Sequence, residues 1–74
     1  MDFLLLIDKK PVMMVEVKSS GDDFSSALFR FQNYLPEARA FQVVYDLARK
    51  KSHGDARMVP AHEFLKNLPM LIAA

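Results

Sequence analysis

Short apolar runs alternate with polar turns in the first third of the chain. DFLLLI (2–7) is followed by the turn-like DKK, and PVMMVEVK (11–18) is rich in valine. Runs of this length and composition predict two strands, and the short polar stretch between them predicts a hairpin. Pro11 fits the first position of its strand, where the missing N–H is tolerated.

A helical pattern follows this hairpin. Between residues 23 and 35 apolar residues recur at helical spacing, after a polar segment, SSGDD, that offers several N-caps. This spacing predicts an amphipathic helix over 23–35, and Pro36 ends it because the residue before a proline avoids helical angles. AFQVVYDL (40–47) predicts a third strand. The order strand, helix, strand predicts a right-handed crossover between parallel strands.

The last third of the chain is more polar at first and apolar at its end. ARKKSHGDAR (48–57) predicts a polar loop centred on Gly54, and residues 60–68 predict a short helix that opens with proline. PMLIAA is an apolar tail that needs cover, for example from a second subunit. We expect a single α/β domain over residues 1–74, with a small mixed sheet, one main helix and a short C-terminal helix.

Length and composition limit how such a domain is stabilised. A chain of 74 residues buries only about 60% of the surface that its unfolded form exposes. Domains of this size usually depend on disulfides, a structural metal or oligomerisation. The chain has no cysteine and two histidines, which excludes disulfides and argues against structural zinc. We therefore expect a homodimer, or support from a missing piece of chain.

Charge and hydropathy narrow the function classes. The formal net charge is +1, whereas dedicated nucleic-acid binders often carry a basic excess. No positively charged segment precedes FLLLI, so no signal peptide is predicted. No apolar run reaches the roughly 18 residues of a membrane span. We expect a cytoplasmic protein with no membrane partner and no small-molecule cofactor.

Two charged residues stand out in the second predicted strand. Glu16 and Lys18 are two positions apart, so their side chains point to the same face. If a three-residue loop joins the two strands, Asp2 faces Glu16, with Cβ atoms roughly 4.5–5.5 Å apart. Carboxylates this close repel one another, and Mg²⁺ or Mn²⁺ would relieve the repulsion. The Val17 carbonyl would supply a further oxygen, and Lys18 would activate a water or stabilise charge in the transition state.

The pattern D-x13-E-x-K on a hairpin, before a helix and a strand, resembles the PD-(D/E)XK nuclease-like superfamily. The segment DFLLL…PVMMVEVKSS is most similar to the nuclease-like C-terminal domain behind the AAA+ ATPase of many prokaryotic proteins. The resemblance covers residues 2–47. It implies a restriction-endonuclease-like core that hydrolyses nucleic-acid phosphodiesters, with Asp2 and Glu16 on the metal. It also implies that Lys18 assists the attacking water and that Gln32 on the following helix approaches the site.

The match is incomplete on its N-terminal side. The superfamily core is usually an α-β-β-β-α-β arrangement, and its first helix and first strand have no counterpart before Asp2. The acidic residue that this helix often contributes has no counterpart either. The sheet would then be truncated, with an open edge that invites pairing with another chain. The alternative function is therefore a non-catalytic, self-associating interaction module, or a fragment of an ATPase-linked protein.

Simpler interpretations stand beside these. Asp2 is also explained as a solvated residue near the chain start, Glu16 and Lys18 as a weak surface pair, and Gln32 as a boundary residue of its helix. The segment RKKSH together with Arg57 is the best basic patch in the sequence. It is either a solvated loop, the interpretation we favour, or a phosphate contact.

Overall fold

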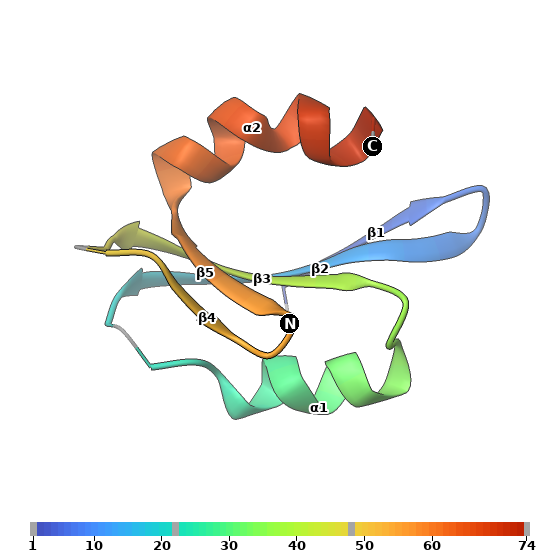
Figure 1. Cartoon of the computed structure of the whole chain (residues 1–74), viewed down its shortest axis with the longest axis horizontal. Helices are drawn as coiled ribbons and strands as arrows, with labels where there is room; N and C mark the ends of the chain where they lie inside the picture. The colour runs from blue at the N-terminus through green and yellow to red at the C-terminus, as the bar shows by residue number, and fades with distance from the viewer. Residues whose placement is uncertain (1, 22, 48, 74) are drawn as a thin grey trace.

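The chain folds into three layers, with a sheet between two helices (Figure 1). The computed structural model describes residues 2–21, 23–47 and 49–73. The sheet has five strands in the order β1-β2-β3-β5-β4, and α1 and α2 lie on opposite faces of it. This is the α/β class that the sequence predicts, with a small mixed sheet. The elements are β1 (Phe3–Ile7), β2 (Lys10–Ser20), α1 (Ser26–Tyr34), β3 (Arg39–Asp46), β4 (Lys51–His53), β5 (Ala56–Pro60) and α2 (Ala61–Ala73).

The β1–β2 hairpin differs from its prediction in a way that preserves its register. The turn holds two residues, Asp8 and Lys9, with φ angles of 53° and 66°, so the predicted three-residue loop is wrong. The register then shifts between Leu5 and Leu6, where Val12 is the extra residue of β2. A bulge of this kind adds one residue to one strand. The pairing beyond it is therefore the pairing that a three-residue loop would have produced.

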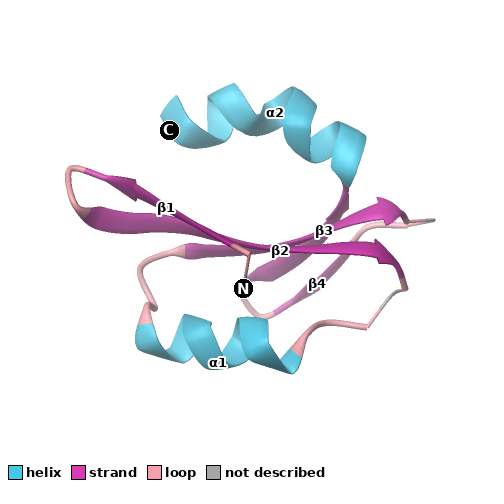
Figure 2. Ribbon diagram, turned by 180° about the vertical axis from the view of Figure 1, so that it is seen from behind, coloured by secondary structure: helices cyan, strands magenta, loops and turns pink. Residues whose placement is uncertain are grey.

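β2 is apolar on both faces because each face has its own helix to cover it. Met13 and Val15 belong to the core beneath α2, whereas Met14 belongs to the core beneath α1. β2 pairs in parallel with β3, and β3 in parallel with β5, as expected for central strands buried on both sides. Figure 2 shows the α1 crossover that joins β2 to β3 on one side of the sheet.

The segment predicted as a polar loop over 48–57 instead contains β4 and the start of β5. These strands form a hairpin that turns at Gly54, whose φ is +59°. β5 lies next to β3, and β4 lies outside β5 at the edge of the sheet. The His53 ring packs on α1, 5.0 Å from the centroid of Phe29. The loop prediction was wrong because a three-residue edge strand with exposed side chains has no apolar alternation.

Both helices have bounds that differ from those predicted. α1 begins at Ser26, and Ser25 is its N-cap, with Oγ accepting the Ala27 N–H at 3.2 Å. α2 continues through Pro69 to Ala73, so the apolar tail is helical and Leu71 packs on the core of its own chain. Neither helix in the described part of the chain combines the length and apolar character that crossing a membrane requires.

Candidate functional site

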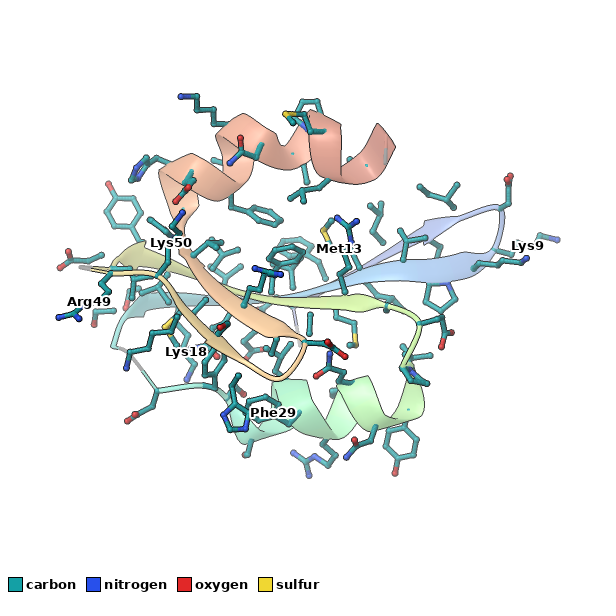
Figure 3. All side chains as sticks on the ribbon, viewed as in Figure 1. Lys9, Met13, Lys18, Phe29, Arg49 and Lys50 are labelled. Atoms are coloured by element: carbon teal, nitrogen blue, oxygen red, sulfur yellow. The ribbon has the colours of Figure 1, made fainter. Side chains whose placement is uncertain are left out.

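The predicted charged pair lies near the carboxyl end of β2. Val15 belongs to the core beneath α2, so by alternation Glu16 and Lys18 point to the α1 face. Figure 3 shows Lys18 on that side of the sheet. Both residues are half-buried. An otherwise apolar strand can carry these two charges because neither residue is fully buried at this end of β2.

Asp2 is held against the backbone of this same segment. Its N–H donates to the Val15 carbonyl at 3.0 Å, and its Oδ2 accepts the Val17 N–H at 2.7 Å. The two bonds flank Glu16, and the register of β1 with β2, continued by one residue past Phe3, brings Asp2 to the same level. The N–H and C=O of a strand residue point to the same side of the strand. The Val17 carbonyl therefore also points toward the side on which Asp2 lies.

The two carboxylates differ in their surroundings. Asp2 is exposed, whereas Glu16 is half-buried and its Oε2 is buried. The described residues contain no cluster of three or more acidic, histidine or cysteine side chains that would form a ready-made metal cage. Mg²⁺ usually needs no such cage, because it keeps several waters and binds one or two carboxylates. Two carboxylates and the Val17 carbonyl are oxygen donors that fit this cation.

Gln42 is a site neighbour that the sequence analysis missed. It pairs in register with Glu16 across the parallel β2–β3 ladder, and its side chain is fully buried. Its Oε1 accepts the Ser25 N–H at 2.7 Å, and its Nε2 donates to the Asp23 carbonyl at 2.8 Å. Gln42 thus fixes the segment that leads into α1. The signal in the sequence was a lone polar residue inside the apolar run AFQVVY.

Gln32 lies elsewhere on α1. It is six residues beyond Ser26, the first residue of the helix, which corresponds to roughly 9 Å along the axis at about 1.5 Å per residue. The residue that pairs with Glu16 holds the opposite, N-terminal end of α1. The structure therefore joins Asp2 to the β2 segment that carries Glu16, Val17 and Lys18, and it places Gln42 in register with Glu16.

The predicted basic patch is divided between the two faces of the sheet. Arg57 pairs with Phe41 and lies on the α2 face, and the Lys50 ammonium bonds to the Glu63 carboxylate of α2 at 2.9 Å. These residues line a cavity of about 310 Å³ together with Phe64 and Asn67. Because Glu16 and Lys18 point to the α1 face, this cavity lies across the sheet from them. Lys50 and Arg57 of the predicted patch are therefore separate from the acidic site.

Comparison with known proteins finds no relative. No family model, no curated protein and no solved structure matches this chain. The interpretation of the site therefore depends on its residues and their geometry.

Proposed function

We propose that this chain is a nuclease-like domain of the PD-(D/E)XK type that hydrolyses nucleic-acid phosphodiesters with a divalent cation. The observation that carries the proposal is the hydrogen bond from the Val17 N–H to Asp2 Oδ2, at 2.7 Å. It joins the acidic residue that directly precedes β1 to the centre of the Glu-Val-Lys motif of β2. The resemblance assigns Asp2, Glu16 and Lys18 to one site, and this bond supports that assignment.

The proposed cation is Mg²⁺ or Mn²⁺. Asp2 and Glu16 would hold it, with the Val17 carbonyl as a further ligand. When bound, the cation would polarise a phosphoryl oxygen and lower the pKa of an attacking water. Because two nearby carboxylates repel one another, a cation between them would also stabilise this end of β2.

Lys18 and Gln42 have separate roles in this proposal. Lys18 projects from the same face as Glu16, where its ammonium would orient the water and stabilise the negative charge that develops at phosphorus. Gln42 is a positioning residue. It takes the supporting place that the resemblance gives to Gln32, because its register places it next to Glu16.

A non-catalytic interaction module is the second candidate, and one observation favours it. Asp2 Oδ2 accepts a backbone N–H, so the same carboxylate also serves to continue the β1–β2 ladder. In this alternative Asp2 is a structural cap, Glu16 and Lys18 are rim residues, and the domain acts through its exposed surface.

Calorimetric titration of Mn²⁺ into the full chain separates the two functions. We expect saturable binding in the wild type, loss of binding in Glu16→Ala, and unchanged binding in Glu37→Ala, which removes an exposed carboxylate from the turn after α1. A folded wild type that binds no Mn²⁺ would support the interaction module instead.

Cleavage of plasmid DNA and of RNA with Mn²⁺ tests the catalytic roles. Lys18→Ala should still bind the cation but lose cleavage, because it retains both carboxylates. Lys9→Ala, in the exposed hairpin turn, is the matched control and should cleave as the wild type does. Unchanged cleavage in Glu16→Ala or Lys18→Ala would contradict the assignment.

A further inference from the structure

β1 is an edge strand made only of apolar residues. Its sequence is FLLLI, and it lies at one end of the strand order. Phe3, Leu4, Leu6 and Ile7 are 63%, 40%, 51% and 39% exposed. Along its outer side, the backbone of an edge strand offers N–H and C=O groups to another strand. An apolar edge with no charge or proline is the kind that pairs with a second chain.

The opposite edge of the sheet, formed by β4, has features that prevent such pairing. β4 is three residues long, its residues are exposed, and Lys51 places a charge on it. Short edge strands and lysines are two devices that block edge-to-edge association. The two edges of one sheet therefore differ, and only β1 is suited to pair with a partner strand.

An apolar groove runs beside β1 on the α2 face. It has a volume of about 410 Å³ and only apolar side chains line it, among them Phe3 and Leu5 of β1 and Leu65, Leu68 and Ile72 of α2. The β1–β2 hairpin extends past the ends of both helices (Figures 1 and 2). A strand placed along β1 would cover the open side of this groove.

We propose that two copies of this chain pair through β1 in antiparallel orientation, which joins their sheets into one. The contact is isologous, because the same strand supplies both sides about a two-fold axis. Charge favours this orientation. Asp2 makes the start of the strand negative, whereas Asp8, Lys9 and Lys10 give its end a net charge of +1. Antiparallel pairing places each negative start beside a positive end, and parallel pairing would place like charges together.

Light scattering after size exclusion tests this dimer with the full chain. We expect a wild-type mass of twice the 8.5 kDa of the chain. Leu6→Lys adds a charge to the β1 edge at a half-exposed position and should reduce the mass to that of one chain. Ser52→Lys adds the same charge to the β4 edge and should leave the dimer intact. Circular dichroism establishes that each variant is folded.

Oxidative cross-linking gives a second measurement, which does not depend on Leu6→Lys folding. The chain has no cysteine, so Leu5→Cys places a single thiol at the centre of β1. In an antiparallel pair the two central residues lie close enough for a disulfide, and we expect a covalent dimer. Ser52→Cys is the control and should stay monomeric. A folded wild type with the mass of one chain, a dimer that persists in folded Leu6→Lys, or equal cross-linking of both cysteine variants would overturn the proposal.

Discussion

Gln42 and Glu16 lie in register on neighbouring parallel strands, and the Gln42 side chain holds the backbone that leads into α1. Its two hydrogen bonds reach Ser25 and Asp23, residues that precede the helix. One buried amide therefore fixes the start of the crossover helix to the strand beside the candidate site. The position of the α1 layer relative to Glu16 depends on this link.

Replacing Gln42 should destabilise the fold more than replacing Gln32. Gln42→Leu keeps the bulk of the side chain but removes both hydrogen bonds. The part-buried Ser25 N–H and Asp23 carbonyl then lose their bonds to this side chain. We expect the free energy of unfolding to fall by about 1–3 kcal/mol, measured by urea denaturation. Gln32→Ala, at a half-buried position of α1, should change it by less than about 0.5 kcal/mol. Equal losses in the two variants would refute a special role for Gln42.

Asparagine at position 2 should separate the structural role of Asp2 from its proposed metal role. Asp2→Asn keeps a side-chain oxygen that can accept the Val17 N–H, but it removes the negative charge. We expect wild-type stability with weaker Mn²⁺ binding. Asp2→Ala loses the acceptor as well, and we expect it to lower the free energy of unfolding by about 0.5–1.5 kcal/mol. Urea denaturation and calorimetry on both variants give the comparison, and Mn²⁺ binding that survives in both would remove Asp2 from the site.

Glycine in the β1–β2 turn should stabilise the protein. Lys9 has a φ of 66°, a left-handed conformation that costs a residue with a side chain roughly 1–2 kcal/mol. Lys9→Gly removes this strain, and we expect a gain of about 1 kcal/mol in a thermal or urea melt. The adjacent Lys10→Gly lies in β2, where glycine should cost about 0.5–1 kcal/mol. If both variants are less stable than the wild type, the turn is not strained at Lys9.

Alanine at position 69 should strengthen α2. Pro69 is an exposed residue inside this helix, where proline lacks the N–H that would bond to the Leu65 carbonyl. Proline is about 3 kcal/mol less favourable than alanine in a helix interior, so we expect Pro69→Ala to raise the free energy of unfolding by about 1–3 kcal/mol. Met70→Ala, at a 72% exposed neighbour, should change it little. A similar change in the free energy of unfolding of both variants would contradict this expectation.

Local sequence patterns were sufficient to predict the β2–α1–β3 unit and the position of Asp2 beside Glu16. Valine-rich runs, an apolar helical stripe and Pro36 each predict a local structure by a short-range physical rule. Asp2 lies level with Glu16 although the predicted turn length was wrong, because the bulge at Val12 restores the predicted register. Bulges depend on packing along the whole sheet, so no local pattern predicts them.

The remaining differences arise where tertiary contacts override local propensity. β4 is exposed and short, and its strand character comes from pairing with β5. α2 passes through Pro69 because its apolar face, which includes Phe64 and Leu71, packs on the sheet. Gln42 was predicted only as part of a strand, since its function depends on two residues that lie 17 and 19 positions away in the sequence.

The central place of β3 has a consequence for how fast the chain acquires its structure. The β1–β2 and β4–β5 hairpins pair locally, but β3 lies between them and is parallel to both β2 and β5. Parallel pairs bring together residues that are far apart in sequence, and such contacts slow folding. We expect the insertion of β3 to limit the folding rate of this small domain. Until that step is complete the inner edge of β2 and the apolar side chains that β3 covers are exposed, so refolding yield should fall as protein concentration rises.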